Sequence, residues 1–338
     1  MSERDENVAM AGLYEAAKDE GGRLVVYAGG DAPEQAGLYT AGFAERFPEI
    51  DVEVTVDLSK YHNARVDGLH LRGENRVDVV HLQTLHDFPH WKREGLLLPY
   101  RPLGAEHGDP AYADPDGTYC ALFAFAFSNV VDTAVIPADR APREAVDYLR
   151  PELKDRIVLT YPHDDDAVLY QFEQLIDRHG YGWLEKLQAQ NPLWVRGTAT
   201  PLAKIASGER AATFTSSYPL NPGAGDTLRF LPAREDFFQS WYQPGAILAA
   251  APHPAAAKLY LSYRLSTEAQ RASAQWPART DITVPNWPAL SAYANTSPAG
   301  FLAFMADRAR VERLRGLLED FIGPVEGPNP TGVDRLWH

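Results

Sequence analysis

The chain offers almost no sulfur chemistry. Its 338 residues include one cysteine, Cys120, which excludes an internal disulfide and a zinc site built from several thiolates. Cys120 lies within the apolar run 119–127, and this setting is typical of a buried thiol that packs rather than reacts. We therefore expect Cys120 to be inert.

Positive charge and long apolar runs are also scarce. The chain has 32 Lys and Arg against 46 Asp and Glu, a formal net charge of −14, which argues against nucleic acid or an anionic membrane surface as a partner. No apolar stretch approaches the about 20 residues that a membrane-spanning helix needs. We therefore expect no direct membrane insertion.

The amino-terminal stretch MSERDENVAMAGLYEAAKDEGG is acidic and helical in pattern. It has no basic start, apolar middle or small-residue cleavage site, which are the three parts of a secretion signal. Two localisations stay open. The protein is periplasmic or otherwise extracytoplasmic if a leader was removed, and cytoplasmic if the sequence is native as given.

Motifs of common enzyme classes are absent as well. The sequence contains no G-x-S-x-G nucleophile elbow, no G-x-x-x-x-G-K-[ST] phosphate loop, no zinc-binding H-E-x-x-H and no dinucleotide-binding G-x-G-x-x-G. Whether the chain is an enzyme stays open, with a non-enzymatic role favoured.

What the chain does contain is an alternation of strands and helices. An apolar run at 24–27 is followed by the glycine loop 28–31 and by an amphipathic stretch that extends to Phe47. This order predicts a buried strand, a turn and a helix, with the loop at the carboxyl edge where open α/β sheets bind ligands. The same alternation restarts after Pro142.

The length favours two domains, because a single core stops growing near about 250–300 residues. We predict an α/β chain whose first lobe comprises residues 1–125 and 247–338, and whose second lobe comprises residues 126–246. Long strands near 124–130 and 240–248 would cross between the lobes. A cleft between two such lobes is the expected ligand site.

Four stretches of the sequence carry a resemblance to a known family. They are GGRLVVYAGGDAPEQAGLYTAGFAERFPEIDVEV, VDVVHLQTLHDFPHWKREGLLLPY, SGERAATFTSSYPL and PGAILAAAPHPAAAKLYLSYRLSTEAQ. In this order and spacing, over about residues 11–285, the chain resembles the solute-binding proteins of ABC importers, in the ferric-ion-binding-like branch. The resemblance implies a two-lobed type II periplasmic-binding-protein fold with a ligand cleft between the lobes, and an ABC permease as partner.

In ferric-binding members of that family, the resemblance implies iron ligands at three places in this chain. The histidine of the first loop resembles Asp31, the glutamate falls on Gln83, and the adjacent tyrosine pair falls on Tyr218 and Pro219. A trivalent ion favours anionic oxygen donors, and two of these positions are neutral here. Ferric ion or another metal is therefore not favoured, and Asp31, His163 and Tyr218 stay the metal candidates.

Polar residues follow several predicted strands at the expected ligand edge. The two glycines of the first loop either present N–H groups to an anion or form a turn that needs positive φ. Asp166 is a candidate N-cap, and the aromatic residues near 241–243 either stack on a ligand or pack within a lobe. The predicted ligand-binding residues are Gly29, Gly30, Asp31, His81, Gln83, Thr84, His86, His163, Asp164, Asp165, Ser216, Ser217, Tyr218 and Tyr242.

Two functions of different classes stay open. The favoured one is a monomeric binding protein that captures a small polar organic solute, closes about a hinge and docks on an ABC permease. The alternative is a cytoplasmic enzyme or sensor that reuses this fold, with His81, His86 and His163 as acid–base groups or metal ligands. The sequence does not identify the ligand.

Overall fold

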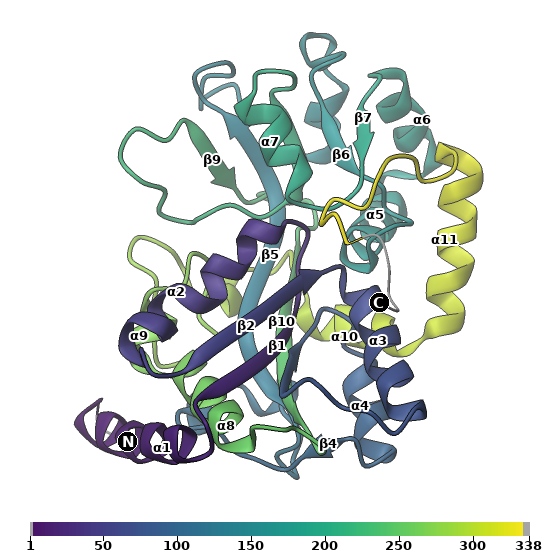
Figure 1. Ribbon diagram of the computed structural model, residues 1–338. Helices are drawn as coiled ribbons and strands as arrows, with labels where there is room; N and C mark the ends of the chain where they lie inside the picture. Colours follow the sequence, from purple (N-terminus) through teal and green to yellow (C-terminus); the bar gives the residue numbers. More distant parts are fainter. Residues whose placement is uncertain (1–2, 334–338) are drawn as a thin grey trace. The chain divides into compact units, whose positions relative to one another are not determined.

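The computed structural model describes residues 3–333 (Figure 1). The described residues form two compact units. Unit 1 comprises residues 3–124, 242–287 and 331–333, and unit 2 comprises residues 125–241 and 288–330.

Unit 1 is built on a mixed sheet with the strand order β2-β1-β3-β10. Strands β1, β2 and β3 run parallel, whereas β10 runs antiparallel to β3 and also pairs with the short strand β4. Leu24 and Val26 on one face of β1 and Val25 on the other are all buried, as expected for a strand that is covered on both faces. The strands are β1 (Arg23–Gly29), β2 (Asp51–Asp57), β3 (Val79–His81), β4 (Leu97–Leu98) and β10 (Gln239–Leu248).

Helices cover this sheet through two apolar clusters. One cluster joins Met10, Phe43 and Tyr260 from helices α1, α2 and α8. The other joins Val66 and Trp91 from helices α3 and α4. The helices of unit 1 are α1 (Glu3–Asp19), α2 (Ala36–Arg46), α3 (Ser59–Leu71), α4 (Asp87–Arg93), α8 (Pro254–Arg264) and α9 (Thr267–Arg271), with short 3₁₀ turns η1 (Pro33–Gln35), η2 (Ala105–His107) and η3 (Pro110–Tyr112).

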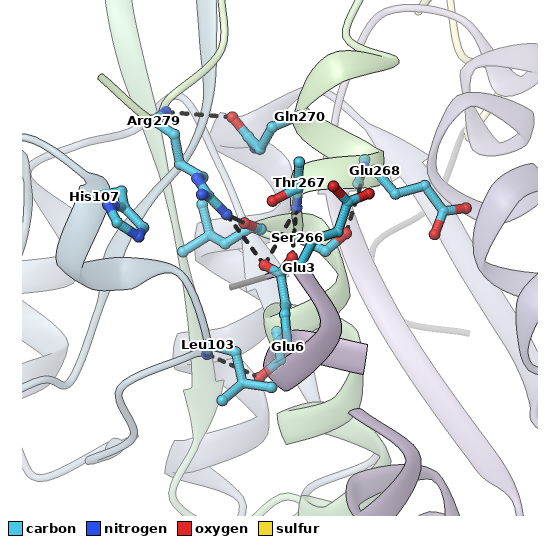
Figure 2. Close-up of polar contacts among 12 residues, drawn as sticks. Glu3, Glu6, Leu103, His107, Ser266, Thr267, Glu268, Gln270 and Arg279 are labelled. Carbon is cyan, nitrogen blue, oxygen red and sulfur yellow. Dashed lines mark hydrogen bonds and ion pairs between the residues drawn. The ribbon is translucent and has the colours of Figure 1, made fainter. Parts of the chain in front are cut away.

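A buried ion pair fixes helix α1 to the rest of unit 1 (Figure 2). Glu6 on α1 accepts hydrogen bonds from the Arg279 guanidinium at 3.1 Å and from the backbone N–H of Thr267 at 3.2 Å. Arg279 also forms an ion pair with Asp281. Because both carboxylates share one guanidinium, the amino-terminal helix and the segment near 280 hold one another in place.

Unit 2 contains two small groups of strands. Strand β5 pairs antiparallel with both β8 and β9, and its register against β8 shifts between Ser128 and Val130. Strands β6 and β7 pair in parallel, and an isolated parallel bridge joins Ile157 to Ala212 at the start of β8. The strands are β5 (Cys120–Asp132), β6 (Val158–Thr160), β7 (Leu193–Val195), β8 (Ala212–Ser216) and β9 (Leu228–Leu231).

The helices of unit 2 include the long carboxyl-terminal helices. They are α5 (Asp166–His179), α6 (Tyr181–Ala189), α7 (Thr200–Ala206), α10 (Pro298–Ala306) and α11 (Arg308–Ile322), with 3₁₀ turns η4 (Ala145–Leu149), η5 (Pro151–Leu153) and η6 (Leu290–Ala292). The sequence pattern predicts residues 247–338 in the first lobe, whereas residues 288–330 belong to unit 2 in the structure.

The physical reason for this difference is the packing of α10 and α11 on α5. The Asp166 carboxylate on α5 accepts hydrogen bonds from Arg308 at 3.2 Å and from Arg315 at 2.5 Å. Beside them, the ring of Phe304 lies 5.0 Å from that of Tyr170. These partners are far apart in sequence, so the helical pattern of residues 301–321 did not identify the surface that the helix covers.

The boundary between the compact units falls inside two strands, between residues 124 and 125 of β5 and between residues 241 and 242 of β10. Cys120 at the start of β5 is buried, and burial raises the pKa of its thiol to about 12. It is therefore protonated at neutral pH and unreactive, as expected. No described helix is both long and apolar enough to cross a membrane.

Candidate functional site

Three strands of unit 1 end at one edge of its sheet. In the parallel register, Gly29 at the end of β1 faces Asp57 at the end of β2, and Ala28 faces His81 at the end of β3. The carboxyl ends of parallel strands are where α/β sheets commonly bind ligands. The predicted residues from Gly29 to Asp31 and from His81 to His86 therefore belong to one edge of unit 1.

Both glycines of the first loop lie close to neighbouring side chains and have an ordinary φ. A Cβ atom on Gly29 would lie 2.2 Å from Ser59 Oγ, and one on Gly30 would lie 2.5 Å from Gln35 Oε1 and 2.7 Å from Val56 Cγ1. Neither glycine has a positive φ. The turn that needs positive φ is thus not the reason for glycine here, and the loop lies directly against α3 and β2.

The N–H groups of this loop already have acceptors in the protein. Gly30 N–H donates to the carbonyl oxygen of Asp57 at 3.0 Å. The N–H groups of Asp31 and Ala32 both donate to Gln35 Oε1, at 2.7 and 3.0 Å. An anion would have to displace these acceptors to use the N–H groups of Gly30, Asp31 and Ala32.

His81 is a packed residue of the core. Its side chain is 0% exposed, its Nε2 lies 3.2 Å from the Tyr260 hydroxyl, and its ring centroid lies 4.6 Å from that of Tyr39. Burial, with the charge of Arg264 as the next cause, lowers the pKa of His81 to about 3. The imidazole is therefore neutral at pH 7 and presents no atom to solvent.

The segment after β3 places the other predicted residues of unit 1. Gln83 is half-buried and donates its backbone N–H to Ser59 Oγ at 2.9 Å, and Thr84 is 6% exposed. His86 immediately precedes helix α4, with Nε2 3.4 Å from Asp87 Oδ1. Of these side chains, Gln83 and His86 reach the surface most.

Three parallel strands of unit 2 also end together. Thr160 at the end of β6 faces Val195 at the end of β7, and the bridge from Ile157 to Ala212 sets β8 parallel to β6. The loops that follow these strands therefore meet at one edge of unit 2. The loops after β6 and β8 carry the predicted residues His163, Asp164, Asp165, Ser217 and Tyr218. The loop after β7 carries none of the predicted ligand-binding residues.

The acidic run of unit 2 divides into three separate interactions. Asp164 accepts a hydrogen bond from Arg196 Nε at 2.9 Å. Asp165 caps α5 by accepting from the N–H groups of Ala167 and Val168, at 2.8 and 3.0 Å. Asp166, which we expected to be the N-cap, is instead the first helical residue, and its carboxylate binds the arginines of α11.

Arg196 is the residue of this edge that sequence reasoning missed. It follows β7, and its side chain is 15% exposed where it contacts Asp164. A basic residue directly after a short apolar strand was the only sequence signal for it. His163 precedes this pair, is 8% exposed and has its ring centroid 5.3 Å from that of Tyr161.

Hydroxyl groups link the three loops of unit 2. Ser216 Oγ donates to the carbonyl oxygen of Thr198 at 2.7 Å, and Thr160 Oγ1 donates to that of Gly197 at 3.1 Å. Ser216 is 0% exposed, so its hydroxyl holds a loop rather than facing solvent. Ser217 and Tyr218, which follow it, are half-buried and more accessible.

Two further predicted residues are tyrosines. Burial, with the charge of Asp226 as the next cause, raises the pKa of Tyr218, so its phenol is protonated at neutral pH. Tyr242 belongs to unit 1, where its ring centroid lies 4.5 Å from that of Tyr112. Tyr242 is thus part of an aromatic pair in that unit.

Among the described residues, the metal-ligating side chains form no cluster, and one apolar cavity lies apart from these strand ends. Within residues 3–333, no three His, Cys, Asp or Glu side chains are grouped so that they could hold a metal ion. Unit 1 has an apolar cavity of about 330 Å³, lined among others by Val66, Leu96 and Leu248. It contains none of the predicted residues and lies near the carboxyl end of β10, which runs antiparallel to β3 and so points away from the edge just described.

This chain shares its sequence pattern with a known protein family. The family model for bacterial extracellular solute-binding proteins matches residues 34–276. The chain belongs to this family. No curated protein sequence matches it significantly.

Solved structures show the same fold. Iron-bound HitA from Pseudomonas aeruginosa superimposes with a TM-score of 0.66 at 18% identity, over 88% of this chain and 99% of HitA. Fructose-6-phosphate-bound AfuA from Actinobacillus pleuropneumoniae gives 0.69 at 19% identity, over 89% and 98%. The substrate-binding protein of an ABC transporter from Agrobacterium tumefaciens gives 0.72 at 16% identity, over 88% and 93%.

These similarities confirm the predicted family and the periplasmic-binding-protein fold. The protein is therefore a member of the bacterial extracellular solute-binding protein family, with the fold of periplasmic binding proteins. Identities below 20% leave the ligand to be argued from the residues of this chain.

Proposed function

We propose that this protein binds a small polar organic solute through strand-end loops, rather than a bare ferric ion. The observation that supports this proposal is the state of the carboxylates at those loops. Asp164 is bound to Arg196 and Asp165 caps a helix. A hard trivalent ion would have to compete for these oxygens.

The remaining accessible groups suit an organic solute. In unit 1 they include the amide of Gln83 and the imidazole of His86, and in unit 2 the hydroxyls of Ser217 and Tyr218. Such groups donate and accept directional hydrogen bonds to hydroxyl, carbonyl or phosphate oxygens. We therefore retain Gln83, His86, Ser217 and Tyr218 as solute contacts, without the buried His81 and Ser216.

The proposed function also includes a cellular location and an oligomeric state. The family is extracellular, so we place the protein outside the cytoplasm, as a monomer that delivers solute to a membrane permease. Cell fractionation tests the location, and light scattering coupled to size-exclusion chromatography tests the monomer. A stable dimer, or a purely cytoplasmic pool, would contradict this part of the proposal.

The decisive experiment identifies the solute. The protein is purified under native conditions, and whatever copurifies is identified by mass spectrometry and by metal analysis. Thermal melting then compares ferric ion, phosphonates, sugar phosphates and polyamines, because a ligand at 100 times its Kd stabilises the folded state by about 2.7 kcal/mol. Stabilisation by an organic compound supports the proposal, and stabilisation by ferric ion alone overturns it.

A further inference from the structure

One arginine of unit 1 lies at the ligand edge without a counter-ion. Arg264 is the last residue of α8 and is half-buried. Its guanidinium carbon lies 4.8 Å from the ring centroid of Phe123 and 5.9 Å from that of Tyr39. These aromatic faces orient the planar guanidinium through cation–π contact.

The other well-buried arginines of unit 1 are paired. Arg65 binds Asp57, and Arg279 binds Glu6 and Asp281. By contrast, Arg264 Nε is buried without a hydrogen-bond partner, and no ion pair joins the guanidinium to a carboxylate anywhere in residues 3–333. A charge withdrawn from water in this way is costly unless a counter-ion arrives.

Contacts of Tyr39 connect Arg264 to the strand ends. The Tyr39 hydroxyl donates to the carbonyl oxygen of Gly29 at 3.3 Å, and its ring packs against His81. The charge of Arg264 opposes the rise in the pKa of Tyr39 that burial causes, whereas the charge of Asp31 adds to it. Arg264 therefore lies beside Tyr39, which contacts Gly29 at the end of β1 and His81 at the end of β3.

We propose that Arg264 binds an oxyanion of the solute, either a carboxylate or a phosphate, through its planar fork. This inference deepens the proposed function, because it names an anionic solute for the same site. Arginine holds such groups with two parallel hydrogen bonds. The neighbouring N–H groups of Asp31 and Ala32 already bind Gln35, so the guanidinium is the charged hydrogen-bond donor that an anion can meet beside this loop.

The test compares charged and neutral probes on three variants. The probes are fructose 6-phosphate against fructose, and succinate against succinamide, measured by isothermal titration calorimetry and thermal melting. Wild-type protein is expected to bind an anionic member and not its neutral counterpart, and the phosphate and carboxylate pairs distinguish the two oxyanions. Arg264→Gln should weaken anion binding by about 100-fold and Arg264→Lys by about 10-fold.

Arg93→Gln is the matched control, since it removes the same charge from an exposed position on α4 in the same unit. It should leave binding unchanged. Equal binding of charged and neutral probes, or full anion binding by a folded Arg264→Gln protein, overturns the role of Arg264 while an organic solute stands. If only ferric ion binds, the proposed function fails and this inference with it. Should Arg264→Gln not fold, the Lys variant and the charge preference of the wild type still decide the question.

Discussion

The two units differ in whether the arginines near their strand ends are paired with carboxylates. In unit 2, the cation that follows β7, Arg196, is matched by the carboxylate that follows β6, Asp164. In unit 1, Asp57 at the end of β2 is matched by Arg65, but Arg264 has no carboxylate partner among the described residues. A strand edge whose arginine has no carboxylate partner can bind an anion. An edge whose charges pair with one another offers hydroxyl and amide groups instead.

The largest effect is expected at the buried ion pair of unit 1. Arg65 and Asp57 are 8% and 0% exposed, so Asp57→Ala leaves a guanidinium buried without its partner. We expect a loss of about 3–5 kcal/mol in the free energy of unfolding, measured by urea denaturation. The exposed pair of Arg23 and Glu53 is the control, and Arg23→Gln should cost under about 1 kcal/mol. Equal losses in both variants would show that the charge at β2 is not buried in solution.

The next prediction concerns how the free energy of unfolding falls as the pH is lowered. The pKa of His81 is lowered to about 3, while an unfolded histidine titrates near about 6.5. The unfolded state therefore binds more protons below about pH 6.5, and stability falls as the pH falls toward 3. One such histidine costs about 2 kcal/mol by pH 5.

His81→Gln should flatten this pH dependence. Unfolding is measured at pH 7 and pH 5 in the wild type and in the variant, with His70→Gln, an exposed histidine of α3, as control. His62 is also buried with its pKa lowered to about 3, so part of the slope should remain. An unchanged slope in His81→Gln would mean that His81 is not the buried neutral group described above.

A smaller loss of stability is expected when the hydrogen bond from Thr331 to Asp57 is removed. Thr331 Oγ1 donates to Asp57 Oδ1 at 2.7 Å, and Thr331 is 4% exposed. Thr331→Val keeps the shape and removes a hydrogen bond to a charged group, so we expect a loss of about 1.5–2 kcal/mol. In the Asp57→Asn background the loss should shrink, because the acceptor is no longer charged. Independent losses in the double variant would argue against a direct bond.

The smallest expected effect lies in unit 2. Asp165→Ala removes the N-cap of α5 and should cost about 1 kcal/mol, whereas Asp165→Ser keeps an acceptor and should cost little. Thermal melting in the absence of solute measures both. If Asp165 contacts solute as well, the Ser variant will lose solute affinity while its stability stays near that of the wild type.

Much of the architecture was predictable from the sequence. The run 24–31 predicted a strand and a loop, and the structure has β1 at Arg23–Gly29. The family and fold predictions are confirmed by the match over residues 34–276 and by the solved structures. The domain assignment and the solute contacts stay predictions, although residues 288–330 belong to unit 2 in the structure.

The α/β class and the loops at strand ends could be predicted from the sequence, because apolar periodicity and turn residues act over neighbouring positions. The family followed from the resemblance of four sequence stretches. Which of the charges at those strand ends are satisfied depends on the folded arrangement. Asp166 meets Arg315 across 149 positions and Asp57 meets Thr331 across 274. Pairing over such separations is set by packing and leaves no local signal, so Arg264 became conspicuous only once its neighbours were in place.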